Sequence, residues 1–372
     1  MSGRLFFCCL QTYFDMHKRL FFISMDPWLP DERGGAQLST KTLFKELEQK
    51  GWEVFIMCRE LNASTEKYQY TIDFTTGFTC LRYKENINSS GMISLFNAQI
   101  KKFNATHVLG EFFSRDIHVC FSLLEFASQR KMKTLCFIRK IENFRELQST
   151  LKIPSTTHLI ANSEFTAKEI FSAFGKKAEV ITPFINFKAV QASTIDPTYI
   201  TFINPIKVKG VETAIDIAKK MPEYRFLFVT GGWHKKNYSE VNPLIKEIKT
   251  LPNIEMIPYQ EDMRSIYAVT KVLIVPSYFE ETFGRVILEA QSNGIPVIGS
   301  NRGNILKTIG DGGFVITDYK NADEYVKKLK FLLDDSVVYQ KYAHVAVLQS
   351  SKEEFSLKFQ VEKFSKLLDK SS

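Results

Sequence analysis

An apolar run at residues 272–275 leads directly into the stretch Pro276-Ser-Tyr-Phe-Glu-Glu-Thr-Phe-Gly-Arg-Val-Ile-Leu-Glu-Ala-Gln-Ser-Asn-Gly-Ile-Pro-Val-Ile-Gly299. The pattern predicts a buried strand, a loop that carries Glu280 and Glu281, and a helix that begins after Gly284. A second apolar run at 296–299 follows the helix. Strand, helix and strand in this order are typical of a βαβ unit in a parallel sheet.

The loop and the start of this helix offer groups that bind anions and hydroxyls. The first N–H groups of a helix lack partners within it, so those of Phe283, Gly284 and Arg285 could receive a phosphate. Glu289, eight residues after Glu281, could accept hydrogen bonds from two adjacent ribose hydroxyls. The alternative is a buried strand, a capped helix and solvated glutamates, and the spacing of two glutamates does not by itself exclude it.

The same alternation of short apolar runs and helical patterns extends over the whole chain. The fold class that it predicts is α/β, with two doubly wound Rossmann-like domains facing a cleft and with helices at the C-terminus. In the first half we expect strands near residues 20–24, 53–57, 107–109, 133–137, 158–161 and 178–181. In the second half we expect strands near 199–203, 226–229, 254–257, 272–275, 296–299 and 314–316.

The domain boundaries follow from this pattern. A segment with two prolines, Pro183 and Pro197, shows neither helical nor strand periodicity and is the expected linker. We therefore expect an N-terminal extension at 1–16, a first domain at 17–183, a linker at 184–198, a second domain at 199–350 and a C-terminal helix at 351–372 that packs back toward the first domain. Met16 is a plausible alternative start of the protein.

Length and composition exclude several classes of protein. The 372 residues exceed what one hydrophobic core usually supports, and 44% hydrophobic with 24% charged residues is typical of globular chains. No apolar run approaches the roughly 20 residues of a membrane-spanning helix. The cysteines show no Cys-x-x-Cys pair, and four of them, Cys58, Cys80, Cys120 and Cys136, fall in apolar segments, so we expect buried thiols. We expect a cytoplasmic protein.

The net charge of +8 lies mainly in the first half. Residues 1–190 hold 25 basic and 19 acidic residues, a net +6, which leaves +2 for the rest. Such a bias suits nucleic acid or an anionic membrane surface. We expect no nucleic-acid partner, because no basic-aromatic stripe or nucleic-acid module is present. Peripheral contact of the basic first domain with a membrane stays open.

The stretch 276–299 closely resembles the Glu-x7-Glu signature of the family 4 retaining glycosyltransferases (glycosyltransferase group 1), which have the GT-B fold. The resemblance covers nearly the whole chain. Its further motifs are the glycine loop Gly34-Gly35, the segment Ala161-Asn162-Ser163, the phosphate lysine at Lys209-Gly210 and the pair Gly231-Gly232.

The resemblance implies roles for individual residues. Lys209 would stabilise the diphosphate that leaves as the sugar becomes oxocarbenium-like. Glu281 would hold hydroxyls of the donor sugar near the reacting carbon, and Glu289 would bind the ribose. The further donor-binding residues would be Gly34, Gly35, Asn204, Gly231, Gly232, Phe283, Gly284, Arg285 and, beside the nucleobase, Tyr259.

The chain departs from the family at three positions. The family usually has an arginine five residues before its lysine, where this chain has Asn204, so one diphosphate cation is absent; Lys207, Lys235 and Lys236 are candidates to replace it. A histidine of the first domain is replaced by Arg139, which cannot act as a base near neutral pH but can bind phosphate or an anionic acceptor. Finally, a glutamate of the family corresponds to Leu306.

The expected function is a metal-independent, retaining transfer of a sugar from a nucleotide diphosphate sugar to a glycan, lipid-linked or small-molecule acceptor. The setting that the resemblance implies is polysaccharide biosynthesis. No Asp-x-Asp pair ends a predicted strand, so we expect no metal, and no cofactor apart from the nucleotide-sugar donor. Two alternatives remain, a nucleotide-sugar epimerase or hydrolase on the same fold and a non-catalytic nucleotide-sugar or glycan-binding protein. Glu111, at the end of a predicted strand, would face the cleft.

Overall fold

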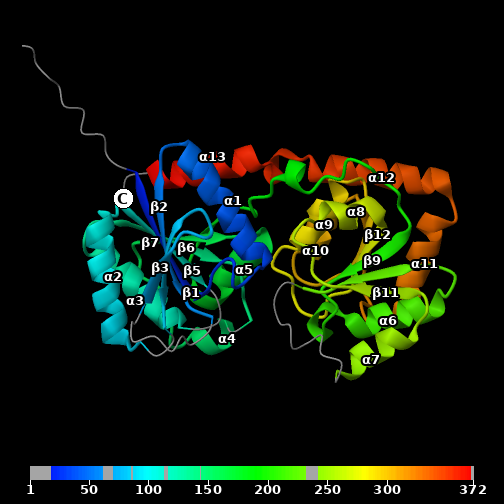
Figure 1. Ribbon diagram of the computed structural model, residues 1–372, viewed down its shortest axis with the longest axis horizontal. Coiled ribbons are helices and arrows are strands. Elements are labelled where there is room, and N and C mark those ends of the chain that lie inside the picture. Colours follow the sequence, from blue (N-terminus) through cyan, green and yellow to red (C-terminus); the bar gives the residue numbers. More distant parts are fainter. Residues whose placement is uncertain are drawn as a thin grey trace, which may run out of the picture.

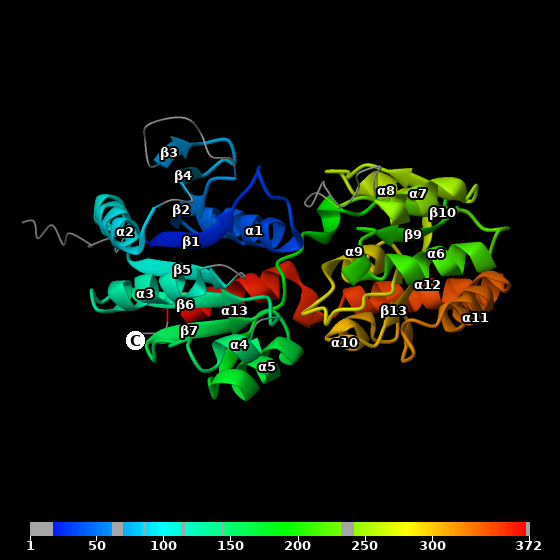
Figure 2. The ribbon, with the colours of Figure 1, turned by 90° about the horizontal axis from the view of Figure 1, so that it is seen from below.

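The computed structural model describes residues 18–61, 70–84, 87–112, 116–142, 144–231 and 242–369. Two α/β domains lie side by side and are joined by two crossings of the chain (Figure 1; Figure 2). The predicted extension at 1–16 lies outside the described residues. So do Gly232, a predicted donor-binding residue, and Lys235 and Lys236, two candidates to replace the absent cation.

The first domain is built on an eight-stranded sheet with the order β3-β4-β2-β1-β5-β6-β7-β8. Only β3 and β4 pair antiparallel; the other neighbours are parallel. The strands are β1 Arg19–Pro27, β2 Glu53–Arg59, β3 Tyr70–Asp73, β4 Thr79–Tyr83, β5 His107–Phe112, β6 Lys133–Ile138, β7 Thr157–Ala161 and β8 Ala178–Val180. The six strands predicted in this half are confirmed, and the β3–β4 hairpin was not predicted.

Helices cover both faces of this sheet, as its apolar strands require. One core contains apolar residues of α2, α3 and α5, and the core on the other face contains those of α1 and α13. The helices of this domain are α1 Gly35–Gln49, α2 Ser89–Phe103, α3 Ile117–Ser128, α4 Phe144–Leu147 and α5 Glu164–Phe174. The four cysteines expected to be buried thiols are free and buried, which confirms that prediction.

The second domain has a six-stranded, wholly parallel sheet with the order β11-β10-β9-β12-β13-β14. Its strands are β9 Tyr199–Ile203, β10 Phe226–Val229, β11 Ile254–Ile257, β12 Thr270–Val275, β13 Val297–Ser300 and β14 Gly313–Ile316, all six as predicted to within two residues. Its helices are α6 Val211–Lys220, α7 Pro243–Thr250, α8 Arg264–Val269, α9 Arg285–Gln291, α10 Ile305–Ile309, α11 Ala322–Leu333 and α12 Ser336–Ser350.

The chain crosses between the domains twice. It leaves the first domain after β8 and passes through the 3₁₀ turn η1 (Phe187–Ala189) before β9 begins. After α12 it passes through η4 (Glu353–Phe355), and α13 (Leu357–Asp369) then lies on the first domain (Figure 1). A small apolar cluster of Ile185, Phe283, Leu288 and Phe355 joins both crossings to the second domain.

Candidate functional site

The centre of the candidate site is a pair formed by Lys209 and Glu281. Lys209 lies in the 3₁₀ turn η2 (Lys207–Lys209) after β9, and Glu281 follows the neighbouring strand β12. The Lys209 Nζ lies 2.5 Å from Glu281 Oε1, and the Ser277 hydroxyl donates to the same oxygen at 2.9 Å. The carboxyl ends of adjacent parallel strands therefore bring together the lysine and the first glutamate, at the edge where ligands of such sheets bind.

Two glycines fix the loop that carries Glu281, residues 276–284. Gly210 has φ +82°, and a Cβ there would lie 1.9 Å from the Pro276 carbonyl oxygen. Gly303 has φ +60°, and a Cβ there would lie 2.3 Å from the Glu281 carbonyl oxygen, which also accepts the N–H of Asn304 at 2.7 Å. Only glycine fits both backbone conformations without strain. The loop is thus contacted at its start, Pro276, by Gly210 and at Glu281 by Gly303 and Asn304.

The second glutamate, Glu289, lies in α9 and is bound by two protein groups. Arg285 Nε lies 2.5 Å from Glu289 Oε1, and the Tyr267 hydroxyl donates to Oε2 at 2.8 Å. Burial, together with the charge of Glu289, raises the pKa of Tyr267, so this hydroxyl stays a donor. Glu289 is 6% exposed. Its ribose role remains a prediction, and since each carboxylate oxygen can accept a second hydrogen bond, ribose hydroxyls would bind beside these two donors.

The glycine loop of the first domain contacts the first residue of α9, Arg285. Gly34 is the N-cap of α1, and Gly35 is its first residue. The Nη1 of Arg285 donates to the Gly35 carbonyl oxygen at 3.2 Å, and a Cβ on Gly35 would lie 3.7 Å from the Arg285 Cδ. The structure therefore brings the predicted residues Gly35, Arg285 and Glu289 into one chain of contacts.

Arg139 is directed into the first domain. Its Nη1 donates to Glu111 Oε1 at 2.6 Å, to Thr40 Oγ1 at 2.6 Å and to the Ala36 carbonyl oxygen at 3.0 Å. Glu111 is fully buried, and burial raises its pKa while the Arg139 guanidinium opposes the rise. These contacts anchor the first turn of α1. Contact of Arg139 with a phosphate or an acceptor remains a prediction.

The other predicted donor residues lie at the ends of β9, β10 and β11. Asn204 follows β9 with φ +65°, a conformation that asparagine tolerates, and its N–H donates to the Val229 carbonyl oxygen at 2.7 Å. The N–H of Tyr259 donates to Thr230 Oγ1 at 2.9 Å, next to Gly231. Burial raises the pKa of the Tyr259 phenol. All of these residues lie at the carboxyl edge of the second sheet.

Thr282 connects the loop that carries Glu281 to the first domain. Its hydroxyl donates to the Arg139 carbonyl oxygen at 2.8 Å and accepts from the Asn162 side-chain amide at 2.9 Å. Asn162 in turn accepts from Thr166 in the first turn of α5. The residue after the candidate catalytic glutamate is therefore bound to the opposite domain.

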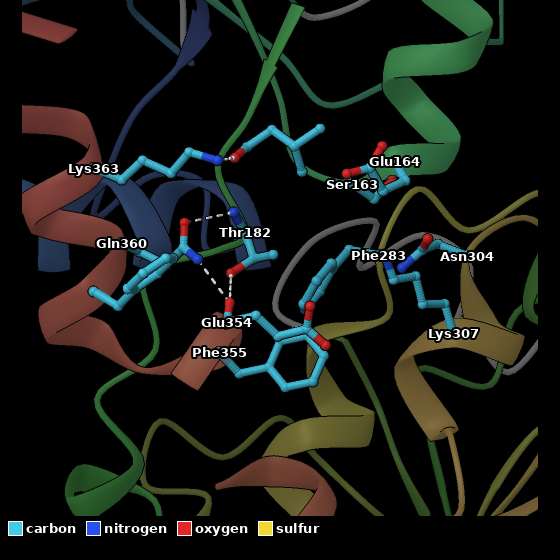
Figure 3. Close-up of a pocket in the computed structure, with 12 residues that line it drawn as sticks. Ser163, Glu164, Thr182, Phe283, Asn304, Lys307, Glu354, Phe355, Gln360 and Lys363 are labelled. Atoms are coloured by element: carbon cyan, nitrogen blue, oxygen red, sulfur yellow. Dashed lines mark hydrogen bonds between the residues drawn. The ribbon is translucent and has the colours of Figure 1, made fainter. Parts of the chain in front are cut away.

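A cavity of about 110 Å³ lies beside this connection, between the two domains. Figure 3 shows Ser163 and Glu164 of the first domain opposite Phe283 and Lys307 of the second. The hydrogen bonds on its far side join the two chain crossings, since the Thr182 hydroxyl and the Gln360 amide both donate to the Glu354 carbonyl oxygen. The residues lining the cavity are Ser163, Glu164, Val180, Thr182, Phe283, Asn304, Lys307, Glu354, Phe355, Phe359, Gln360 and Lys363.

The described part of the chain has neither a cluster of metal-binding side chains nor a helix that could span a membrane. Its side chains form no group of three or more His, Cys, Asp or Glu residues with the geometry of a metal site. Among its helices, none has the length and apolar composition needed to span a bilayer.

Three residues of the site were not predicted from the sequence: Ser277, Thr282 and Tyr267. Ser277 and Thr282 lie within the stretch 276–299, so their proximity to Glu281 in the chain was the available signal. Tyr267 comes from α8 and reaches Glu289 only through the packing of α8 against α9, for which the sequence carries no local signal.

A family model and several curated proteins match parts of the chain. The family model of glycosyl transferases group 1 matches residues 186–347. Over 143 residues the chain is 29% identical to spore coat protein SA of Bacillus subtilis, a match that covers 35% of this chain and 37% of that protein. Over 180 residues it is 27% identical to the D-inositol 3-phosphate glycosyltransferase of a Mycobacterium species, covering 43% and 40%. The chain thus matches less than half the length of either relative.

Solved structures resemble the whole chain. HepE of Anabaena in complex with UDP-glucose superposes with a TM-score of 0.76 at 15% identity, over 95% of this chain and 99% of that one. A glycosyltransferase from Rickettsia africae gives a TM-score of 0.73 at 18% identity, over 95% and 100%. At these identities the likeness establishes the arrangement of the two domains and nothing finer.

Proposed function

We propose that this protein transfers a sugar from a nucleoside diphosphate sugar to an acceptor bound by its first domain. The premise is that residues 186–347 are a glycosyl transferases group 1 domain in a chain with the GT-B fold. The observation that carries the proposal is the 2.5 Å pair of Lys209 and Glu281 at the ends of two adjacent strands. HepE, whose structures contain UDP and UDP-glucose, supports a nucleotide-sugar donor.

The chemistry of the transfer requires both members of this pair. The bond between the anomeric carbon and the diphosphate oxygen breaks, and the electron pair leaves with the nucleoside diphosphate. A bond forms from the acceptor oxygen to the anomeric carbon, and the proton of the acceptor hydroxyl passes to the departing diphosphate oxygen. Lys209 would stabilise the negative charge that develops on the diphosphate. Glu281 would accept hydrogen bonds from hydroxyls of the donor sugar, with Ser277 and Lys209 holding its carboxylate.

The proposal includes a reaction without a metal ion and with retention of the anomeric configuration. Lys209 and the N–H groups after Phe283 are the groups that would replace a metal at the diphosphate. Retention rests on the resemblance to the family 4 enzymes. Determination of the anomeric configuration of the product by NMR tests it, and a product of inverted configuration would overturn this part of the proposal while leaving the transferase activity intact.

The acceptor would be a glycan, a lipid-linked saccharide or a small molecule. The net charge of +6 over residues 1–190 supports peripheral contact with an anionic membrane surface if the acceptor is lipid-linked. Co-sedimentation with anionic and neutral vesicles at two salt concentrations tests this part. Equal binding to both kinds of vesicle, or no binding to either, would speak against it.

Variants of the two glutamates test the proposal itself. Wild type is assayed with UDP-, GDP- and ADP-linked sugars for release of nucleoside diphosphate in the presence and absence of acceptors. We expect Glu281→Ala to lower kcat by about 100-fold or more with nucleotide affinity kept, since an interaction of the transition state is lost. We expect Glu289→Ala to weaken nucleotide binding by about 10- to 100-fold, the loss of a charge-assisted hydrogen bond.

Glu280→Ala is the matched control, because Glu280 directly precedes Glu281 and its exposed side chain pairs with Arg302 at 3.5 Å. It should leave kcat and nucleotide affinity unchanged within about twofold. Full activity of Glu281→Ala would remove the assignment. Release of sugar without an acceptor would indicate a hydrolase, and binding without turnover over a broad range of acceptors would indicate a binding protein.

A further inference from the structure

Among the described residues, the positions that the resemblance assigns to the donor diphosphate hold one cation, Lys209. Asn204 stands where the resemblance implies an arginine, and its backbone lies in the left-handed region. Lys209 remains, and its charge is shared with Glu281 at 2.5 Å. Charged groups buried beside a ligand of the same sign cost free energy, so Glu281 and Glu289 increase the need for a further cation at the diphosphate.

Two other cations near the carboxyl edge of the second sheet, Lys207 and Arg302, have other partners. Lys207, one of the candidates named from the sequence, has a 76% exposed side chain that pairs with Glu212 at 3.7 Å. Arg302 pairs with Glu280 at 3.5 Å and donates to the Tyr278 carbonyl oxygen at 3.1 Å. Neither side chain contacts a residue predicted to bind the donor.

Arg285 has the required position. Its side chain is 16% exposed and lies between Glu289, which it contacts through Nε at 2.5 Å, and the Gly35 carbonyl oxygen, which it contacts through Nη1 at 3.2 Å. It therefore touches predicted donor-binding residues of both domains. A guanidinium carries five N–H donors in a planar fork, and these two contacts use two of them.

The covalent structure of a nucleotide links these contacts to the diphosphate. The phosphates are attached to the same ribose whose hydroxyls Glu289 is proposed to bind. A guanidinium that already lies on the Glu289 carboxylate is therefore within one side-chain length of the phosphates. A phosphate oxygen is also a stronger acceptor for a guanidinium than the neutral carbonyl of Gly35, which it would replace as a partner.

We propose that Arg285 is a ligand of the donor diphosphate and replaces the cation that is absent at Asn204. The inference rests on the proposed function and deepens it by adding a phosphate-binding residue of this chain. In the structure Arg285 joins Glu289 to Gly35. When the nucleotide binds, Nε keeps Glu289 oriented toward the ribose, and the terminal nitrogens move from the Gly35 carbonyl to phosphate oxygens.

Calorimetric titration tests this with UDP, GDP and ADP, and with uridine, guanosine and adenosine as the matching nucleosides. The readout is the ratio of the affinity for the diphosphate to the affinity for its nucleoside, for the base that wild type binds most tightly. We expect Arg285→Gln to lower that ratio by about 10- to 100-fold, the effect of one charge-assisted hydrogen bond. Arg285→Lys keeps the charge and should lose less. Arg302→Gln, which removes an arginine of the same domain, should leave the ratio unchanged.

The outcomes separate the inference from the proposed function. Equal losses of nucleoside and diphosphate affinity in Arg285→Gln would overturn the inference, because they would show that Arg285 only orients Glu289. An unchanged ratio would overturn it as well. Wild type that binds none of the three diphosphates would instead contradict the proposed function, and the inference would fall with it.

Discussion

Arg139 shows how a single substitution changes the chemistry that a position offers. A histidine there would be a base or a proton donor, whereas the arginine makes three hydrogen bonds inside the first domain and pairs with the fully buried Glu111. Two charges removed from water are costly unless each compensates the other. The Arg139–Glu111 pair therefore helps to hold α1, and the glycine loop at its start, in position.

Removal of one partner of this pair should be strongly destabilising. We expect Glu111→Ala to lower the free energy of unfolding by about 3–5 kcal/mol, because it leaves the Arg139 guanidinium buried without a counter-charge. Urea unfolding followed by circular dichroism measures the loss. Glu247→Ala, which breaks the surface pair with Lys219 at 2.6 Å, is the control and should cost about 0–1 kcal/mol. An unfolding midpoint of Glu111→Ala equal to that of wild type would contradict the buried-charge argument.

Some contacts of the site were predictable from the sequence and others were not. Lys209 and Glu281 each follow a strand, and the order of a doubly wound sheet makes those strands neighbours, so their convergence follows from the pattern. The inward orientation of Arg139 depends on Glu111 and Thr40, which lie on separate elements. Periodicity carries no information on such partners.

At the scale of elements, strand prediction worked wherever a strand is an uninterrupted apolar run. It missed β4 because Arg82 lies within that strand and breaks the apolar pattern. In the structure Arg82 is buried, with its charge balanced by Asp31 at 3.0 Å and Asp73 at 2.5 Å. It also donates to the Leu29 carbonyl oxygen at 2.6 Å. A buried arginine with two carboxylate partners thus resembles an exposed residue when only the sequence is read.

The helix α13 follows the second domain in sequence, but its apolar side chains pack in the core of the first domain. Phe364 is fully buried, stacks on Phe137 with ring centroids 5.6 Å apart and packs edge-on against Phe184 at 6.1 Å. We expect Phe364→Ala to lower the free energy of unfolding by about 3–5 kcal/mol, by loss of transfer energy and formation of a cavity.

The fluorescence of Trp28 and Trp52, both in the first domain, reports this loss during urea unfolding. The control is Phe359→Ala on the same helix, where the side chain is 37% exposed, and it should cost less than half as much. If Phe364→Ala and Phe359→Ala shifted the unfolding midpoint equally, α13 would not be a part of the first core.

At the scale of the whole molecule, the relation between the domains depends on a few polar contacts in addition to the chain crossings. In the described residues they include the Thr282 hydrogen bonds to Arg139 and Asn162, the Arg285 bond to Gly35 and the 2.5 Å pair of Arg33 and Glu261. The sequence predicted two domains facing a cleft. It gave no indication of these contacts, because each joins residues of different domains that no local pattern relates.

Thr282→Val tests whether the contact beside Glu281 matters for turnover. Valine keeps the shape of the side chain but loses both interdomain hydrogen bonds, each of which contributes about 0.5–1.5 kcal/mol. We expect kcat to fall by about 10-fold with little change in nucleotide affinity, and small-angle scattering to show a larger radius of gyration. Thr282→Ser should restore activity in part.

Thr213→Val is the matched control, because the Thr213 hydroxyl bonds only within the second domain, to the Tyr278 hydroxyl at 2.8 Å. It should leave the radius of gyration unchanged. If Thr282→Val kept full kcat and the same scattering profile, the contact would have no part in domain closure.

The convergence of Lys209, Glu281 and Glu289 on a nucleoside diphosphate is tested most directly by a crystal structure of the protein with the diphosphate, UDP, GDP or ADP, that it binds most tightly. We predict a phosphate oxygen about 3 Å from Lys209 Nζ and the ribose hydroxyls on the Glu289 carboxylate. A diphosphate bound away from this edge of the second sheet, or a Lys209 that makes no phosphate contact, would contradict the account.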